Sequence, residues 1–172
     1  YRSWWGFETL PEVNEETPSY VEFITGEGGV IDTWLRRGAA GFRLDVADEL
    51  PDEFIEKVRT AVKRVGPDKF LLGEVWEDAT TKFGFDKRRT YLLGKGLDSV
   101  MNYPFKNAVL GFVCGRDAGQ TMTDILSICE HYPAPALDTA LNFLSTHDTE
   151  RALTVIADEP ANGRGREWQS GR

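Results

Sequence analysis

Short apolar runs alternate along this chain with longer segments in which apolar residues recur at helical spacing. The runs cover 41–45, Phe70 to Val75 and Leu141 to Thr146, and a weaker one covers Leu97 to Tyr103. Runs of this length, bounded by Gly, Pro or polar residues, are typical of strands buried on both faces of a parallel sheet. The pattern therefore predicts an α/β fold built from strand–helix–strand units.

The clearest predicted helix extends from about Pro51 to Val65. Acidic residues in its first turn and basic residues in its last turn both favour the helix dipole, and Gly66-Pro67 follows as a stop signal. Further helices are predicted over 29–37, 105–114, 118–132 and 149–157. In the helix over 118–132, an apolar stripe that includes Met122 and Leu126 is expected to face the core.

Two segments lack a clear period. Residues 1–19 read as an ordered loop, and residues 77–96 read as a polar loop at the rim of the sheet with room for one short helix. The remaining elements make about four strand-and-helix units. Because an eight-stranded α/β barrel needs about 200 residues or more, a chain of 172 residues can hold only part of one.

A carboxylate lies at the end of each of the three strongest apolar runs. Asp45 and Glu74 come at the ends of the first two runs, and Asp148 comes just after the third. Because parallel strands end at one mouth of the sheet, these side chains are expected to meet in a single pocket. Three acids in one pocket indicate either carboxylate chemistry or a metal.

Composition narrows the range of partners. A net charge of −8 without a basic tract argues against nucleic acid or an anionic membrane and fits a neutral substrate. The two cysteines and two histidines do not have zinc-ligand spacing, so reduced thiols and no cofactor are expected. No run approaches the roughly 18 apolar residues of a membrane span, and the first residues do not resemble a signal peptide. A cytoplasmic location is therefore expected.

Three motifs resemble, in order and approximate spacing, the second, third and fourth signature regions of the α-amylase family of glycoside hydrolases. They are Gly41-Phe42-Arg43-Leu44-Asp45, Gly73-Glu74-Val75-Trp76 and Phe143-Leu144-Ser145-Thr146-His147-Asp148. A fourth, Leu10-Pro11-Glu12-Val13-Asn14, is similar to the signature at the end of that family's inserted B domain, in the form typical of neopullulanases and cyclomaltodextrinases.

The resemblance implies a partial (β/α)8 TIM barrel that holds about strands four to seven with their helices. Residues 1–19 would be the end of the inserted B-domain loop, and residues 20–172 would be the partial catalytic barrel. The first three strands, the eighth strand and a C-terminal β-domain would lie outside this sequence.

The resemblance also implies retaining hydrolysis of α-linked glucans such as maltooligosaccharides, cyclodextrins, pullulan or starch. In that chemistry Asp45 is the nucleophile and Glu74 the acid/base, with their carboxyl groups about 5 Å apart. Asp148 would stabilise the positive charge that develops on the sugar ring. Each acid has an ordinary structural alternative, as a helix cap or a surface ion pair.

Three further residues are predicted to bind or orient the substrate. Arg43 lies two residues before Asp45 on the same strand face, so its guanidinium can hold that carboxylate ionised and oriented. By resemblance, His147 would hydrogen-bond sugar hydroxyls, and Trp76 is a candidate for stacking on a sugar ring. Packing is the alternative role for Trp76, as it is for Tyr103 and the Trp4–Trp5 pair.

Two other functions stay open at this point. The three acids could bind Mg²⁺ in a metal-dependent barrel enzyme, or the chain could be a non-catalytic glucan-binding or structural fragment. The family's first signature region, on strand three, has no counterpart in this sequence. The isolated chain is therefore expected to be weak or inactive, and its unpaired sheet edges and apolar faces are expected to make it a homo-oligomer.

Overall fold

A computed structural model of the chain describes residues 2–157. Its central sheet is parallel, with the strand order β1 (Gly41–Leu44), β2 (Phe70–Gly73) and β5 (Ser99–Val100). Helix α3 (Asp52–Val65) connects β1 to β2, so the predicted strand–helix–strand unit is present. In the register of this unit, Gly41 pairs with Phe70 and Leu44 pairs with Gly73.

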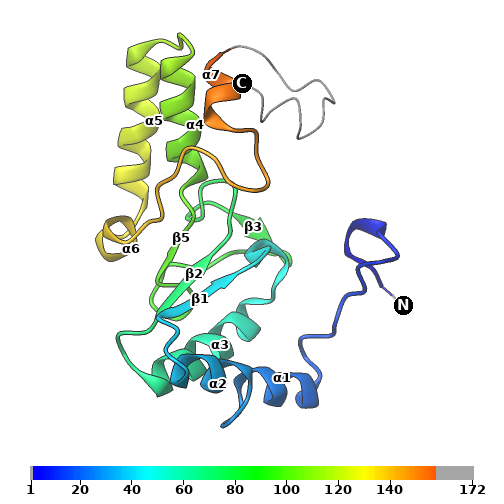
Figure 1. Cartoon of the computed structure of the whole chain (residues 1–172). Coiled ribbons are helices and arrows are strands. Elements are labelled where there is room, and N and C mark those ends of the chain that lie inside the picture. Colours follow the sequence, from blue (N-terminus) through cyan, green and yellow to red (C-terminus); the bar gives the residue numbers. More distant parts are fainter. Residues whose placement is uncertain (1, 158–172) are drawn as a thin grey trace.

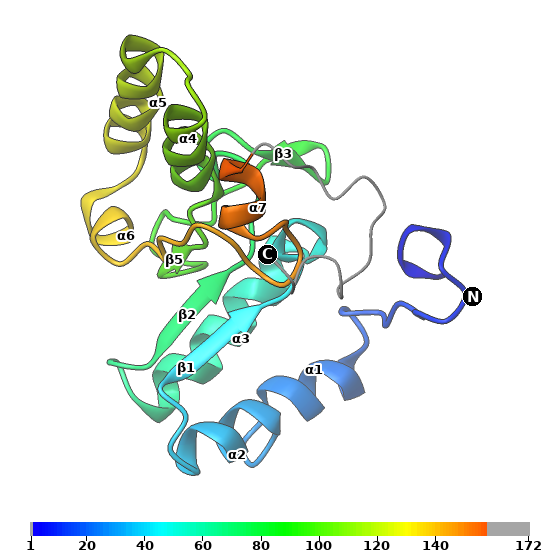
Figure 2. The ribbon, with the colours of Figure 1, turned by 45° about the horizontal axis from the view of Figure 1, so that its top comes forward.

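The other elements lie outside this sheet. They are η1 (Trp4–Gly6), α1 (Pro18–Thr25), α2 (Val30–Arg36), η2 (Ala47–Glu49), β3 (Phe83–Gly84), β4 (Lys87–Arg88), α4 (Tyr103–Val113), α5 (Ala118–His131), α6 (Ala134–Asp138) and α7 (Ala152–Ile156). Helices α1, α2 and α3 pack together beside the sheet, whereas α4 and α5 form a separate pair with α7 beside α4 (Figures 1 and 2).

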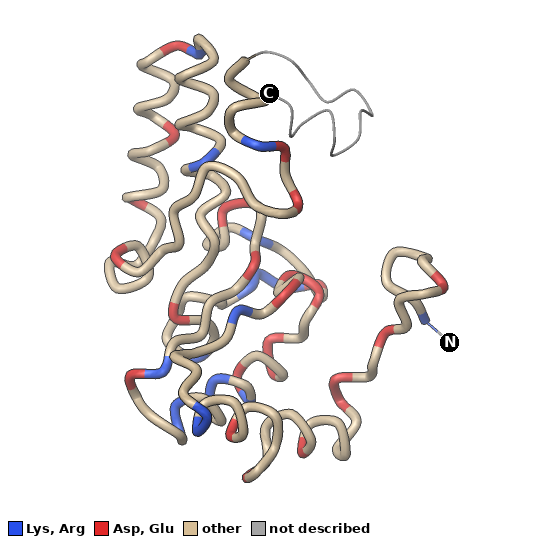
Figure 3. The backbone as a smooth tube through the Cα atoms, viewed as in Figure 1, with Lys and Arg blue, Asp and Glu red and all other residues tan. Residues whose placement is uncertain are grey.

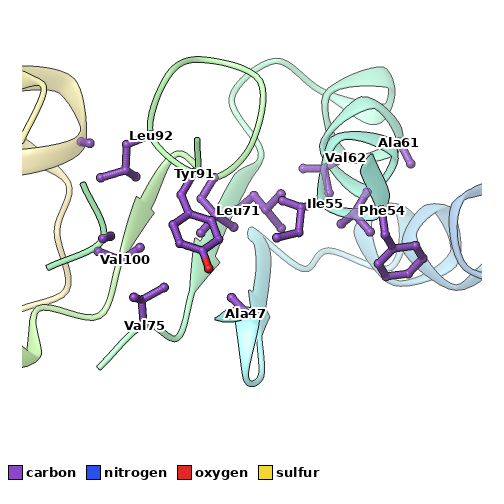
Figure 4. Packing of buried hydrophobic residues seen from close by; sticks show 14 of the residues in the cluster. Ala47, Phe54, Ile55, Ala61, Val62, Leu71, Val75, Tyr91, Leu92 and Val100 are labelled. Carbon is purple, nitrogen blue, oxygen red and sulfur yellow. The ribbon is translucent and has the colours of Figure 1, made fainter. Parts of the chain in front are cut away.

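The core lies between β2 and α3. Leu71 of β2 points toward Ile55 of α3, and Tyr91 lies beside Leu71 (Figure 4). The predicted apolar face of α3 is buried, including Val58 and Val62. Each such side chain contributes about 1.5–3 kcal/mol when it is fully buried. Periodic apolar residues therefore fix this helix against the sheet, and the sheet carries the candidate site.

Asp98 ties α3 to the sheet. Its carboxylate accepts hydrogen bonds from Arg59 Nη1 at 2.7 Å, from Lys63 Nζ at 2.8 Å and from the backbone N–H of Leu71 at 2.8 Å. Burial by itself raises the pKa of the Asp98 carboxyl, but these three hydrogen bonds outweigh burial and lower that pKa below its ordinary value of 3.8. The folded state therefore favours the ionised form.

Replacing Asp98 by Asn is expected to destabilise the chain by about 1–3 kcal/mol near neutral pH, because two cations lose their partner. Since the folded pKa is lowered, this stability is present above the unfolded pKa and is lost as the pH falls through the folded pKa. Urea unfolding is measured at neutral pH and at several pH values below the ordinary Asp pKa. The difference in free energy of unfolding between the wild type and the variant should shrink as the pH falls. Asp68→Asn, at an exposed carboxylate, is the control. A difference in free energy of unfolding that does not change with pH would contradict the role of the ionised Asp98 carboxylate.

Most predicted helices are confirmed, but two connections differ from the expectation. Residues 77–96 contain an antiparallel hairpin, β3–β4, whose turn residues Phe85 and Asp86 both have left-handed φ values, of 53° and 59°. Turns of this kind usually contain Gly or Asn at these positions, so this hairpin is not predictable from its turn residues. The connection between the helix over 118–132 and Leu141, for which no helix is predicted above, contains α6. It begins directly after Pro133, and Pro135 is compatible with its first turn.

The predicted strand over Leu141 to Thr146 is largely wrong. Only Leu141 forms a parallel bridge, to Met101, and the chain then turns locally. The N–H of Thr146 donates to Thr149 Oγ1 at 3.0 Å, and the N–H of Asp148 donates to Thr146 Oγ1 at 3.2 Å. Such side-chain hydrogen bonds compete with strand pairing. The predicted core stripe of α5 is also wrong, since Met122 and Leu126 are exposed.

The structure agrees with the pattern of charge in the sequence. Acidic and basic positions are spread along the described part of the backbone rather than gathered in one basic tract (Figure 3). Within residues 2–157, no helix has both the length and the apolar character needed to cross a bilayer. The predicted boundary between residues 1–19 and 20–172 stays a prediction.

Candidate active site

The site begins where β1 and β2 end. Asp45 and Glu74 directly follow the paired residues Leu44 and Gly73, so the register of the two strands places them side by side. The N–H of Glu74 donates to the carbonyl of Leu44 at 3.0 Å, and the N–H of Ala47 donates to the carbonyl of Glu74 at 3.1 Å. These bonds extend the ladder one step beyond the strands and hold both backbones rigidly.

Packing favours a glycine before Glu74. A Cβ atom at Gly73 would lie 2.2 Å from Leu97 Cδ1, so any larger residue would force the Leu97 side chain to move. Leu97 is buried and belongs to the main core. The buried side chain of Leu97 therefore packs directly against the backbone of Gly73 and fixes the position of the end of β2.

The carboxylate of Glu74 is buried and held from several directions. Its Oε2 atom accepts the N–H of Val46 at 2.8 Å, and its Oε1 atom accepts the indole N–H of Trp76 at 2.9 Å. Val46 has a left-handed φ of 45°, which is unusual for a β-branched residue. This strained turn points its N–H at Glu74, so the loop after β1 and the end of β2 orient the same carboxylate.

Arg43 links the first two acids. Its Nη1 atom forms a close ion pair with Asp45 Oδ1, and its Nη2 atom lies 3.1 Å from Glu74 Oε2. The contact with Asp45 follows from the shared strand face, whereas the contact with Glu74 comes from the pairing of β1 with β2. Asp45 stays open to solvent, with 72% of its side chain exposed. One guanidinium thus holds an accessible carboxylate beside a buried one.

The three acids share one open cavity of about 850 Å³. Its lining residues are Trp4, Trp5, Leu10, Pro11, Asp45, Val46, Asp48, Glu49, Glu74, Trp76, Glu77, Lys82 and Asp148. The structure therefore brings Asp45, Glu74 and Asp148 together, and Trp76 joins them. The volume lies within the range of about 300–1,000 Å³ that is typical of small-molecule sites.

Two residues considered for substrate binding occupy other positions. His147 lies outside the cavity lining, with 73% of its side chain exposed, and its Nε2 atom is 3.1 Å from Asp148 Oδ2. Tyr103 is buried, which raises the pKa of its phenol. Its ring stacks on Trp76 with centroids 4.6 Å apart and also meets the edge of Phe143. Tyr103 therefore supports Trp76 from behind instead of meeting a sugar.

Several lining residues lie outside the motifs and were not predicted from the sequence. They are Asp48 and Glu49, in η2, and Glu77 and Lys82, in the loop after β2. Lys82 Nζ lies 2.9 Å from Asp48 Oδ2 and also pairs with Glu77, so this cation links the two loops. In the part of the chain that the structure describes, no group of three or more His, Cys, Asp or Glu residues is placed to bind a metal ion.

Comparison with known proteins decides the family. The sequence matches "Alpha amylase, catalytic domain" over residues 3–167. The chain belongs to the α-amylase family. This α-amylase segment is 34% identical to the amylopullulanase of Thermoanaerobacter thermohydrosulfuricus, in an alignment 193 residues long that covers 95% of the segment and 12% of that protein. It is 37% identical to a Bacillus cyclomaltodextrinase over 152 residues, which cover 86% of the segment and 25% of that protein.

A solved structure supports the same assignment. The cyclic α-maltosyl-(1→6)-maltose hydrolase of Arthrobacter globiformis, in complex with maltose, superposes on the α-amylase segment with a TM-score of 0.81 at 31% identity. The match covers 91% of this segment and 34% of that enzyme. The segment therefore spans about a third of that enzyme's length, and its architecture is part of a (β/α)8 barrel.

Proposed function

We propose that this chain provides the nucleophile and the acid/base of a retaining α-glucan hydrolase. The observation that carries the proposal is the arrangement of Asp45 and Glu74 on adjacent strand ends, joined by Arg43 and opening into a cavity that Asp148 also lines. A retaining glycosidase needs two carboxyl groups close enough to act on one glycosidic bond. Two carboxylates that share one guanidinium fit that requirement.

In the first step, the Asp45 carboxylate attacks the anomeric carbon while the carboxylic acid of Glu74 protonates the leaving glycosidic oxygen. The C–O bond to the leaving sugar breaks as a covalent glycosyl ester forms on Asp45. In the second step, Glu74 takes a proton from water, and that water displaces Asp45. Asp148, which lines the same cavity, stabilises the positive charge on the sugar ring in both steps.

The substrate class follows from the relatives and from the lining. The relatives above are named for pullulan, cyclodextrin and maltosyl-maltose hydrolysis. The cavity offers Trp76, whose exposed ring can stack on a pyranose, beside several hydrogen-bonding carboxylates. We infer that the chain forms barrel strands four to seven, with residues 1–19 as the end of an inserted loop. Strand three would bring further residues to the pocket.

Covalent trapping tests the nucleophile directly. A complete barrel that contains this chain is incubated with a fluorinated glucosyl fluoride, which forms the ester rapidly and hydrolyses slowly. Peptide mapping by mass spectrometry is expected to find one glucosyl group on Asp45. The Glu77→Gln variant, at an exposed carboxylate of the same cavity, should be labelled to the same extent. A label on another residue, or none in an active enzyme, would refute the role of Asp45.

The isolated chain holds only part of a catalytic barrel, and this favours a non-catalytic role for it. Within residues 2–157, no strand pairs with the outer edge of β1. Exposed apolar side chains include Phe23, Trp34, Phe112, Met122, Leu126 and Leu153. We infer that the isolated chain self-associates to cover these surfaces and hydrolyses maltooligosaccharides feebly or not at all. Sedimentation velocity should find a dimer or larger species, and a product assay should find little cleavage. An active monomer would contradict both expectations.

A further inference from the structure

Three aromatic rings stack on one another near the start of the chain. The rings of Trp4 and Trp5 are nearly parallel, with centroids 5.1 Å apart and an angle of 16°, and Trp4 and Phe7 stack at 6.1 Å and 24°. Trp4 lies between the other two rings. The rings on either side of it are exposed to solvent, Trp5 by 74% and Phe7 by 56%. A contiguous aromatic surface in water indicates a binding site.

The stack is held at a fixed place. The N–H of Trp4 donates to the carbonyl of Leu10 at 2.9 Å, which closes the loop on itself. Trp5 has a left-handed φ of 51°, a conformation that a bulky residue adopts only when its surroundings impose it. Its indole Nε1–H donates to Glu49 Oε1, and Glu49 belongs to the turn just after β1. The exposed ring is thereby fastened to the segment that carries Asp45.

The stack and the acids line the same space. Trp4 and Trp5 lie on the wall of the 850 Å³ cavity that Asp45 and Glu74 also line. Acidic side chains are the most frequent charged groups among the described residues of that lining. Lys82 is the one cation among them, and it is already paired with Asp48 and Glu77. Such a wall disfavours an anionic ligand. A neutral ligand with an apolar face and a hydroxylated edge suits it, and a glucopyranose ring has both.

We propose that Trp5, supported from behind by Trp4 and Phe7, is a platform that stacks on a pyranose ring of the α-glucan whose cleaved bond lies at Asp45 and Glu74. This inference rests on the proposed function and adds a second aromatic contact, separate from Trp76. Glu49 has two parts in it, because it orients the indole of Trp5 and leaves a carboxylate oxygen beside the hydroxyl edge of the bound sugar. The platform is a binding element and takes no part in bond cleavage.

Calorimetric titration of the 172-residue chain with maltohexaose tests the platform. Trp5→Ala is expected to weaken binding by about tenfold, the loss expected for one good aromatic stacking contact. Trp5→Phe should restore part of the affinity, since it keeps a flat ring. The matched control is Trp34→Ala, which removes a 52% exposed tryptophan on α2 away from the cavity and should leave the affinity unchanged. Circular dichroism of each variant checks its fold.

The outcomes separate the platform from the proposed catalysis. Equal affinities of the wild type, Trp5→Ala and Trp34→Ala would overturn the platform, and so would the absence of maltohexaose binding by the wild-type chain. Equal losses in Trp5→Ala and Trp34→Ala would also overturn it. A complete barrel that carries Asp45→Asn should lose hydrolysis, which reports on the proposed function and not on the platform. Binding that depends on Trp5 in a complete barrel that cleaves no glucan would support the platform and refute the proposed function.

Discussion

Asp45→Asn in a complete barrel that contains this chain is expected to lower kcat/KM for maltooligosaccharides by about a thousandfold or more, as removal of a nucleophile does in other enzymes. The amide keeps the volume of the side chain but cannot form the glycosyl ester. Because the Asp45 side chain is 72% exposed, the free energy of unfolding should change by less than about 1 kcal/mol. Initial rates together with urea unfolding separate these two effects.

Two comparisons make that result specific. Glu77→Gln changes an exposed carboxylate of the same cavity and should keep most of the wild-type rate. Asp45→Asn should also leave the affinity for maltohexaose nearly unchanged, so that the loss appears in kcat. Turnover by Asp45→Asn at the wild-type rate would show that another group is the nucleophile. A matching loss in Glu77→Gln would show that charge in the cavity, and not Asp45, controls the rate.

Arg89→Met is expected to have the largest effect on stability. Arg89 is buried, and its guanidinium donates to the carbonyls of Asp48 and Leu50 at 2.7 and 2.6 Å and to Asp52 Oδ1 at 2.8 Å. It also lies over the ring of Tyr91, 4.4 Å from the centroid. Removing one partner of a buried ion pair typically costs about 3–5 kcal/mol. The midpoint of urea unfolding should fall accordingly.

Neighbouring variants provide the controls for Arg89. Arg89→Lys keeps the charge but loses the planar fork, so its stability should lie between those of the wild type and Arg89→Met. Arg88→Met removes an exposed arginine whose hydrogen bonds within residues 2–157 go to the carbonyl of Thr80, and it should cost less than about 1 kcal/mol. Equal effects of Arg88→Met and Arg89→Met would contradict the anchoring role. Because Arg89 holds the loop that follows Asp45, hydrogen exchange at Val46 and Ala47 should quicken in Arg89→Lys.

Local patterns in the sequence were sufficient to predict the strand–helix–strand unit and the two acids at its strand ends. Apolar spacing predicted α3 within one residue, because a helix that buries one face repeats that face in its sequence. Apolar runs predicted β1 and β2; β2 is largely buried, whereas β1 contains Arg43 and is half-buried along its length. The parallel arrangement then placed Asp45 and Glu74 at one mouth, and the two-residue period of a strand put Arg43 beside Asp45.

Contacts between segments that are distant in the sequence are determined by the tertiary structure alone. The ion pair of Arg43 with Glu74, the N–H of Val46 directed at that carboxylate, and the support of Trp76 by Tyr103 each join residues from different elements. No local period encodes them, because they depend on strand register and on a strained turn. Arg89 is the clearest case: it is a basic residue in a polar segment, and only the packing of the β3–β4 hairpin against the loop after β1 makes it a buried anchor.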